Sequence, residues 1–329
     1  MAPFEVIQGG GGAHDAIATM RREVREGLAR PPRSIPPKYF YDERGSRLFD
    51  AICDLPEYYL TRAEAALLTR HADEIVTLVG ARTLVEIGSG MARKTGPLVR
   101  ALCDHGASPL YVPFDIAHAA VEACARALLA RAPRLTVRGL VGDFAYDLPR
   151  LSTAAPASSG PRLFALLGST IGNLDEHAAP AFLRSVARLL TQRDGFLLGV
   201  DLVKDERALH AAYNDARGVT AEFNKNVLRV LSRELGADFD EHAFDHLAFY
   251  DAERQRIEMH LVSRRRQLVS VPAIRLEVEI AAGERILTEI SRKFTRASVE
   301  RALELGGMRL RAWYSDDEGS FALCLAVRA

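Results

Sequence analysis

The sequence has no long hydrophobic run, no net charge and no paired cysteines, and each absence excludes a class of protein. Its longest apolar runs, residues 163–168 and 196–200, have the length of a strand and are far too short to cross a bilayer. The 43 basic residues balance the 43 acidic residues, so the overall basic field typical of nucleic-acid-binding and membrane-binding proteins is missing. The four cysteines are scattered without a C-x-x-C pair, which favours free thiols in a reducing cytoplasm over disulfides or a zinc site.

The composition is that of a globular protein. The chain has 329 residues, of which 48% are hydrophobic and 26% are charged, so we expect one large or two modest domains. The first residues lack the basic start and apolar core of a secretory signal peptide. Because residues 9–12 are all glycine, we expect a flexible leader over residues 1–12. We therefore expect a cytoplasmic protein.

The central part of the sequence alternates between short apolar strands and amphipathic helices. This rhythm predicts an α/β fold, a doubly wound parallel sheet covered by helices on both faces. A terminal hairpin, with strands at 309–314 and 321–327, would close this sheet with an antiparallel strand. The expected strands are 83–86, 110–114, 135–141, 163–167 and 195–201, and the expected helices are 94–102, 117–131, 178–190 and 295–305.

Two flanking regions interrupt this pattern. After a helix at 14–30, residues 35–59 are rich in aromatic residues and proline, which predicts an irregular collar. Thr61-Arg-Ala-Glu64 has the form of a capping box and predicts a helix through Leu78. The pattern is helical from 206 to 237 and then changes to alternating strands up to 280, which predicts a second, α+β unit.

One glycine-rich turn carries most of the chemical information. Glu86-Ile-Gly88-Ser-Gly90 follows a strand and precedes a helix, where free backbone N–H groups can bind a ligand. A nicotinamide-dinucleotide site would need a third glycine, but Arg93 occupies that position. The acidic-x-Gly-x-Gly pattern resembles the first motif of class I S-adenosylmethionine-dependent methyltransferases. A simple tight turn is the alternative.

Polar side chains also end the next strands. Asp115 follows the second strand and is placed to bind a ribose, whereas Asp143 follows the third strand and is placed to bind an adenine amino group beside Phe144. Each aspartate could instead cap a helix. Asn173 follows the fourth strand and could meet a substrate or only complete its own turn. His242 and His246 are four residues apart, but no third ligand accompanies them, so we expect surface histidines and no metal site.

Longer strings carry a more specific resemblance. The chain resembles the bacterial and fungal histidine N-alpha-methyltransferases of ergothioneine biosynthesis from about Ile35 to Val327. The matching strings include Pro36-Pro-Lys-Tyr-Phe-Tyr-Asp, Leu55-Pro-Glu-Tyr-Tyr, Leu167-Gly-Ser-Thr-Ile-Gly-Asn, Gly218-Val-Thr-Ala-Glu-Phe-Asn and Leu287-Thr-Glu-Ile-Ser-Arg-Lys-Phe. Within the turn, this chain has Gly90-Met-Ala-Arg-Lys where the family commonly has Gly-Thr-Ser-Glu-Lys, and Leu60 stands where proline often follows the tyrosine pair.

The resemblance implies a function and a set of site residues. It implies trimethylation of the α-amino nitrogen of free L-histidine to hercynine by a monomer, with S-adenosyl-L-methionine as cofactor. The balanced charge and the short apolar runs predict that no nucleic acid or membrane takes part. The methyltransferase domain would comprise residues 63–203 and 293–329, and a substrate domain would comprise 13–62 and 204–292.

The resemblance also implies a role for individual site residues. Asn173 and Tyr213 would hold the histidine carboxylate, Tyr58 would lie near the amino group, and these three would form the catalytic set. Glu289 and Ser291 would bind the imidazole, and Met259 and Phe49 would line its pocket. The cofactor would contact Tyr41, Gly88, Lys94, Asp115, Asp143 and Phe144.

Three other functions remain open on the sequence. A relative of the same architecture could act on tryptophan or tyrosine in place of histidine. A nicotinamide oxidoreductase is disfavoured by Arg93. A binding module without catalysis could use S-adenosylmethionine or histidine as a signal.

Overall fold

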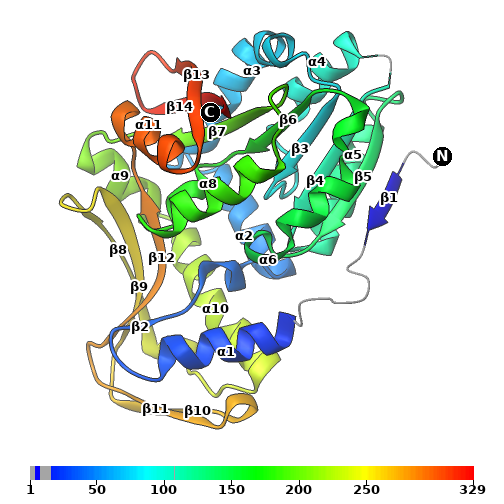
Figure 1. Cartoon of the computed structure of the whole chain (residues 1–329). Coiled ribbons are helices and arrows are strands. Elements are labelled where there is room, and N and C mark those ends of the chain that lie inside the picture. Colours follow the sequence, from blue (N-terminus) through cyan, green and yellow to red (C-terminus); the bar gives the residue numbers. More distant parts are fainter. Residues whose placement is uncertain (1–3, 8–15, 107) are drawn as a thin grey trace. The chain divides into compact units, whose positions relative to one another are not determined.

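The computed structural model describes residues 4–7, 16–106 and 108–329. These residues divide into two compact units (Figure 1). The first unit contains the N-terminal strand together with Leu60–Val203 and Lys293–Ala329, and the second contains the remaining residues before Leu60 and Lys204–Arg292. Among the described helices, none combines the length and the apolar composition that a membrane span requires.

The first unit is built on an eight-stranded sheet with the order β1-β5-β4-β3-β6-β7-β14-β13. Its central strands are made of apolar residues that are buried along their whole length, as expected for parallel strands with helices on both faces. The strands are β1 (Phe4–Ile7), β3 (Thr83–Ile87), β4 (Leu110–Asp115), β5 (Thr136–Val141), β6 (Arg162–Leu166), β7 (Gly195–Asp201), β13 (Met308–Ser315) and β14 (Phe321–Arg328).

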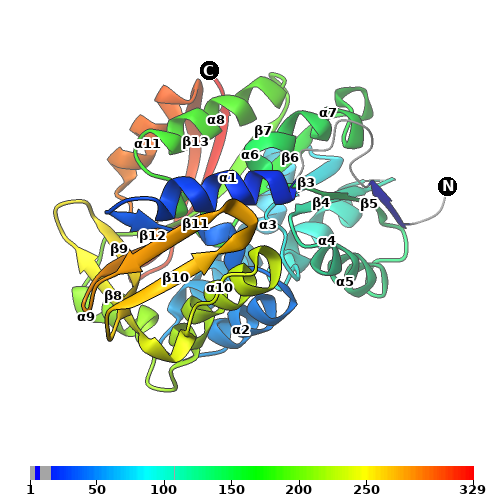
Figure 2. The ribbon, with the colours of Figure 1, turned by 90° about the horizontal axis from the view of Figure 1, so that it is seen from below.

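Helices cover both faces of this sheet, with α5 on one face and α8 and α11 on the other (Figure 2). Phe182 and Leu183 of α8 and Leu303 of α11 pack on buried strand residues to form one continuous core. The helices of this unit are α3 (Tyr59–Val79), α4 (Gly96–His105), α5 (His118–Leu129), α6 (Phe144–Asp147), α7 (Leu151–Ala154), α8 (Ala178–Leu189) and α11 (Arg296–Leu305).

The strand order confirms the predicted doubly wound α/β fold. The chain moves outward from β3 through β4 to β5 and then returns to place β6 on the other side of β3. This reversal creates a topological switch point, and ligands bind in such sheets at the carboxyl ends of the strands around it. The predicted terminal hairpin is also confirmed, because β14 pairs antiparallel with both β7 and β13.

The second unit is an α+β unit, as predicted. Its four-stranded sheet has the order β2-β12-β9-β8, and β10 and β11 form a separate hairpin. Helix α10 packs against α2 and β8. The elements are α1 (Ala16–Leu28), β2 (Arg33–Ser34), α2 (Glu43–Cys53), α9 (Glu206–Tyr213), α10 (Val219–Leu235), β8 (Phe244–Asp251), β9 (Arg256–Ser263), β10 (Gln267–Val271), β11 (Leu276–Ile280) and β12 (Arg285–Arg292).

The structure corrects four local predictions. Phe4–Ile7 is not flexible leader but a strand, because it pairs in parallel with β5; the glycine run at 9–12 lies outside the described residues. The collar contains the helix α2, which Asp42 caps by accepting from the Gly45 N–H at 2.8 Å. The helical stretch 206–237 is broken before Val219, where Gly218 has a φ of +71°. Finally, Thr61-Arg-Ala-Glu64 is no capping box, since α3 already begins at Tyr59.

Candidate active site

The glycine turn after β3 has a left-handed backbone conformation at both glycines. Gly88 and Gly90 have φ values of +70° and +48°, which glycine adopts without the steric cost of a Cβ atom. A Cβ atom at either position would meet no atom within 4 Å, so backbone conformation and not crowding favours glycine here. The Gly90 N–H donates to Asp115 Oδ2 at 2.8 Å, which joins this turn to the end of β4.

Asp115 is fixed by the turns around it. Its Oδ1 accepts from the Ala117 N–H at 3.0 Å, while Oδ2 accepts from Gly90. Burial raises the pKa of this carboxyl, although the backbone N–H groups of Ala117 and Gly90 lower it in part. The side chain therefore has a defined position at the carboxyl end of β4.

The acidic residue of the motif has a supporting role. Glu86 is buried in β3 and accepts hydrogen bonds from Thr95 Oγ1 at 2.8 and 3.0 Å and from Tyr111 Oη at 2.5 Å. Burial raises the pKa of Glu86 to about 7, against the opposing effect of these two donors. Glu86 thus ties the strand to the segment before α4 and to β4.

The end of β5 confirms the helix-cap alternative for Asp143. Its Oδ1 accepts from the Ala145 N–H at 2.9 Å and caps α6. The next residue, Phe144, packs edge-on against Phe182 with ring centroids 5.5 Å apart. The predicted adenine contact of Asp143 and Phe144 stays a prediction.

The segment after β6 forms a second turn with positive φ angles. Gly168 and Ser169 both have positive φ values, +74° and +56°, and Ser169 Oγ accepts from the Asp201 N–H at 3.0 Å. The turn leads into the short helix η4 (Thr170–Asn173). Asn173 therefore lies just beyond β6, at the carboxyl end of a strand that neighbours β3.

A residue that the sequence analysis missed connects these turns. Glu64 of α3 is fully buried; its carboxylate pairs with the Lys94 ammonium and accepts from the Gly168 N–H at 2.8 and 2.9 Å. The sequence analysis missed this role because it assigned Glu64 to a capping box at the start of the helix. Its helical spacing from the apolar residues Leu60, Leu67 and Leu68, which are also buried, is the signal that places Glu64 on the buried face.

These residues fit S-adenosylmethionine. The Ser89 hydroxyl in the glycine turn is buried without a hydrogen-bond partner. Buried polar groups normally have a partner, so this hydroxyl indicates a ligand-binding position. Lys94 offers an ammonium for a carboxylate, while Asp115 and Asp143 offer acceptors for hydroxyl and amino groups. All four residues lie at or just beyond the carboxyl ends of the neighbouring strands β3, β4 and β5. The first unit thus provides complementary groups for a nucleoside that carries an amino acid.

In the second unit, one face of the sheet carries the residues predicted to bind imidazole. Glu289 on β12 pairs across the sheet with Met259 on β9, and Ser291 pairs with Ile257. Glu289, Ser291 and Met259 are all buried. Tyr213 Oη donates to Ser291 Oγ at 2.7 Å. The structure therefore brings Tyr213, Ser291, Glu289 and Met259 together.

Aromatic residues surround this face. The Tyr58 ring lies edge-on to Tyr213 and to Phe49, with centroids 6.3 Å apart in both pairs, and Tyr41 lies 5.7 Å from Phe49. Burial raises the pKa of Tyr58 well above its usual value, and the neighbouring Tyr213, Cys53, Tyr41 and Glu289 add to this shift. Tyr58 is therefore a neutral phenol.

The two units divide the predicted site residues between them. The first unit holds Gly88, Lys94, Asp115, Asp143, Phe144 and Asn173, and the second holds Tyr41, Phe49, Tyr58, Tyr213, Met259, Glu289 and Ser291. The predicted contact of Tyr41 with the cofactor and the predicted pairing of Asn173 with Tyr213 on a carboxylate therefore stay predictions.

Two further residues support Tyr213. Asn224 of α10 is fully buried; its amide nitrogen bonds His246 Nδ1 at 2.9 Å and the His260 carbonyl at 3.0 Å. His246 Nε2 in turn donates to the Tyr213 carbonyl at 2.9 Å. His246 is thus not a surface histidine on a helix, as predicted, but a strand residue whose pKa is lowered mainly by burial. Among the residues that the structure describes, no cluster of His, Cys, Asp and Glu side chains could hold a metal ion.

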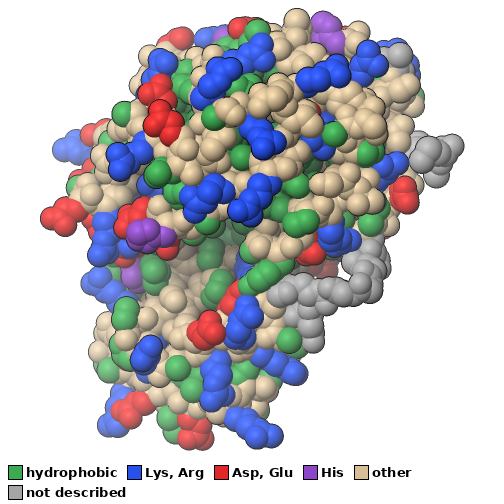
Figure 3. All heavy atoms as spheres, in the orientation of Figure 1, with side chains coloured by type: hydrophobic (Ala, Val, Ile, Leu, Met, Phe, Trp, Pro, Cys, Tyr) green, Lys and Arg blue, Asp and Glu red, His purple; other side chains and the backbone are tan. Residues whose placement is uncertain are grey.

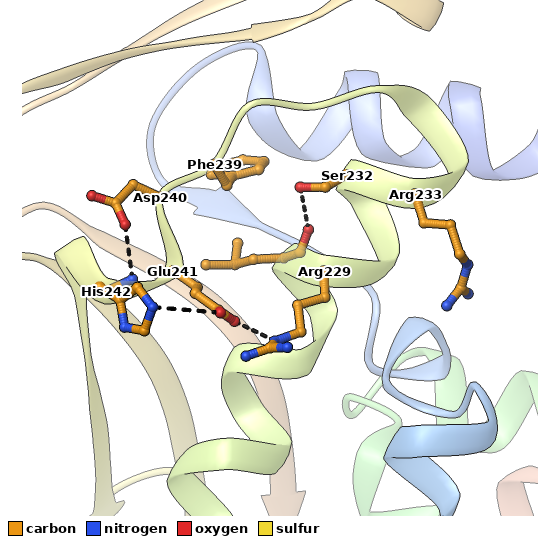
Figure 4. A pocket seen from close by; sticks show the side chains of 8 residues that line it. Arg229, Ser232, Arg233, Phe239, Asp240, Glu241 and His242 are labelled. Carbon is orange, nitrogen blue, oxygen red and sulfur yellow. Dashed lines mark hydrogen bonds and ion pairs between the residues drawn. The ribbon is translucent and has the colours of Figure 1, made fainter.

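A pocket elsewhere on the second unit shares no residue with these sites. It lies between α10 and the segment that leads into β8, and Figure 4 shows its lining side chains. Its charged groups are engaged, because Arg229 pairs with Glu241, and Arg233 pairs with Asp42 and Glu234. We assign this pocket no role in the chemistry.

Comparison with known proteins identifies the family. Residues 20–328 match the family described as histidine-specific methyltransferase, SAM-dependent. The chain is 46% identical over 316 residues to the histidine N-alpha-methyltransferase of Mycolicibacterium smegmatis, covering 96% of this chain and 97% of that protein. It is 44% identical over 309 residues to the histidine N-alpha-methyltransferase of Mycobacterium tuberculosis, covering 94% and 95% of the two chains. It is also 31% identical to ergothioneine biosynthesis protein 1 of Neurospora crassa, over 88% of this chain and 33% of that protein. The chain therefore belongs to the family of histidine-specific, S-adenosylmethionine-dependent methyltransferases.

Proposed function

We propose that this protein transfers three methyl groups in succession from S-adenosylmethionine to the α-amino nitrogen of free L-histidine. The product is hercynine, and the reaction is the first step of ergothioneine biosynthesis. Its family and the names of its relatives support this proposal. The observation that carries it is the buried Glu289 and Ser291 pair, which faces Met259 and Tyr213 in the second unit.

This pair complements a neutral imidazole. Such a ring has one N–H donor and one acceptor nitrogen. The Glu289 carboxylate accepts from the N–H. Ser291 Oγ accepts from Tyr213, and a serine hydroxyl can also act as a donor, so Ser291 complements the acceptor nitrogen. A side chain without matching groups would leave a buried polar group unpaired, which costs about 1–3 kcal/mol or more.

The first unit binds the cofactor in this proposal, and the second unit binds histidine. The sulfonium of S-adenosylmethionine supplies the methyl group and a positive charge, which favours the neutral form of a nearby amine whose usual pKa is about 8. Methyl transfer requires the nitrogen to lie in line with the methyl group and the sulfur, and such orientation contributes several kcal/mol. In this proposal the ring of Tyr58, a neutral phenol, stabilises the cationic product through a cation–π contact.

The reaction is tested by mass spectrometry of histidine incubated with the purified protein and S-adenosylmethionine. We expect mass gains of one, two and three methylene groups, with fragments that place them on the α-nitrogen. If calorimetry shows cofactor binding but histidine gains no mass, the histidine assignment is wrong. A screen of tryptophan, tyrosine and the other amino acids would then identify the substrate.

The proposed contact between Glu289 and the imidazole of the substrate is tested by Glu289→Leu. We expect kcat/KM for histidine to fall about 100-fold, because the imidazole N–H loses its buried acceptor. Glu277→Leu is the matched control, since Glu277 is an exposed residue of β11 in the same unit, and it should keep wild-type activity. Full histidine activity in Glu289→Leu would show that another residue binds the imidazole N–H.

We also propose that the protein acts as a cytoplasmic monomer without a nucleic-acid or membrane partner. The four cysteines are free thiols, as is typical of reducing compartments. The 43 basic and 43 acidic residues balance, and Figure 3 shows both kinds interspersed on the face that it draws. Light scattering of the purified protein tests the monomer, and a mass of twice 36.2 kDa would contradict it.

A further inference from the structure

We propose that Glu64 is a positioning residue of the cofactor site, which fixes the Lys94 ammonium and the end of β6 in one geometry. The inference rests on the proposed function for the identity of the cofactor. Its observations all lie within the first unit. Glu64 belongs to α3, Lys94 to the turn after β3, and Gly168 to the turn after β6.

The contacts of Glu64 define its role. Its carboxylate pairs with the Lys94 ammonium and accepts from the Gly168 N–H with both oxygens, at 2.8 and 2.9 Å. The Glu64 side chain has an exposed fraction of 0%, whereas Lys94 retains 18%. An ammonium has three donors, so the bond to Glu64 sets the direction of the two others. The partly exposed ammonium is thereby held ready for an anionic group.

The packing around Glu64 leaves room for this carboxylate. Gly199 of β7 lies beneath it, and a Cβ atom at position 199 would be 2.0 Å from Glu64 Oε1. Gly199 has no positive φ that would favour glycine for backbone reasons. The space that glycine leaves in the middle of a buried strand is therefore filled by the Glu64 carboxylate.

Stability alone does not account for a charge at this position. The neighbours of Glu64 on the same helix face are Leu60, Leu67 and Leu68, all buried. Well-packed apolar residues are commonly as stabilising as a buried ion pair, or more so, because the ion pair must be desolvated. The carboxylate instead orients its partners. It connects the turn after β3 with the turn after β6, and these neighbouring strands lie at the switch point of the sheet.

The first test is the affinity of Glu64→Gln for S-adenosylmethionine and S-adenosylhomocysteine, measured by calorimetry. We expect both dissociation constants to rise about tenfold, as for the loss of one charge-assisted hydrogen bond. Histidine KM should stay unchanged. The matched control is Glu74→Gln, the same change on the same helix at a residue that accepts from Tyr314 at 3.1 Å, and it should bind both ligands as the wild type does. Glu64→Asp keeps the charge but shortens the side chain, so it should also bind more weakly.

A double-mutant cycle with Lys94→Met separates positioning from general stability. If Glu64 acts through Lys94, Glu64→Gln should cost no further affinity in the Lys94→Met background. Additive losses, or a lowered melting temperature with unchanged affinity in Glu64→Gln and Glu64→Asp, would overturn the inference. Failure of the proposed function gives a different result: wild-type protein would bind S-adenosylmethionine, with the Glu64 dependence intact, yet leave histidine unmethylated.

Discussion

Glu86 has its carboxylate buried between Thr95 and Tyr111, and its pKa is raised to about 7 by that burial. A carboxyl whose folded-state pKa exceeds its unfolded value holds its proton longer in the folded chain. From pH 4.5 to about 7, the unfolded chain has released the proton while the folded chain retains it. The free energy of unfolding therefore decreases as pH rises through this interval.

Glu86→Gln should remove this pH dependence, since the amide does not titrate. At about pH 8 the wild type carries the full cost of the buried charge, about 3 kcal/mol, whereas at about pH 5 it carries little. Urea unfolding of both proteins at the two pH values measures the effect. We expect the variant to gain stability relative to the wild type at the higher pH. A difference between the two proteins that does not change with pH would show that Glu86 titrates normally.

Asn224 is the second residue whose effect should be large. Its amide nitrogen donates to His246 Nδ1 and to the His260 carbonyl, and its amide oxygen accepts from Thr288 Oγ1 at 2.6 Å. Asn224→Ala should lower the free energy of unfolding by about 2–4 kcal/mol, because several buried groups lose their partner. Histidine KM should also rise, since His246 holds the Tyr213 backbone.

Arg229→Ala serves as the control for this change in urea unfolding and steady-state kinetics. Arg229 is exposed on the same helix and pairs with Glu241, and surface ion pairs of this kind contribute about 0–1 kcal/mol. If Asn224→Ala is no less stable than Arg229→Ala, the network around Asn224 is not important for the second unit.

Strand β12 shows how far the sequence pattern predicts a side-chain arrangement. Residues two apart on a strand point to the same side, and Glu289 and Ser291 do lie on one buried face. The pattern did not reveal the irregular register between Leu287 and Glu289. At this bulge two consecutive residues, Thr288 and Glu289, are both buried. A bulge depends on the partner strand, so the sequence of β12 alone does not specify it.

At β7, a single methyl group should disturb the cofactor site. Gly199→Ala would place a Cβ atom 2.0 Å from Glu64 Oε1, so the carboxylate must move. We expect a loss of about 1–3 kcal/mol in the free energy of unfolding and weaker binding of S-adenosylhomocysteine. Thermal unfolding and calorimetry measure the two effects.

Two companion variants identify the cause. Gly96→Ala is the control for stability, since a Cβ atom there meets no atom within 4 Å and the residue lies in α4. Combining Gly199→Ala with Glu64→Ala should recover part of the lost stability, because the clash is removed. Equal destabilisation in the single and double variants would mean that the methyl group acts on another neighbour, such as Phe321, 3.4 Å away.

At the scale of the whole molecule, the division into two units predicts separable responses to ligands. Hydrogen exchange with S-adenosylhomocysteine alone should slow at the turns around Gly88, Asp115 and Gly168. Peptides from β9 and β12 should change with histidine instead. Ligand binding suppresses local opening of the segments that it contacts. Protection by S-adenosylhomocysteine confined to β9 and β12 would contradict the assignment of the cofactor to the first unit.

The fold class, the glycine turn and the family could be predicted from the amino-acid sequence. These features are local: apolar strands, positive-φ glycines and strand-end aspartates occupy short, contiguous stretches, and long matching strings occur in order along the chain. Which of these stretches come into contact depends on how the elements pack in three dimensions. The pairing of β1 with β5, the burial of Glu64 above Gly199 and the link from Asn224 through His246 to Tyr213 all join residues distant in sequence. Such contacts depend on how elements pack, and no local pattern of residues encodes that packing.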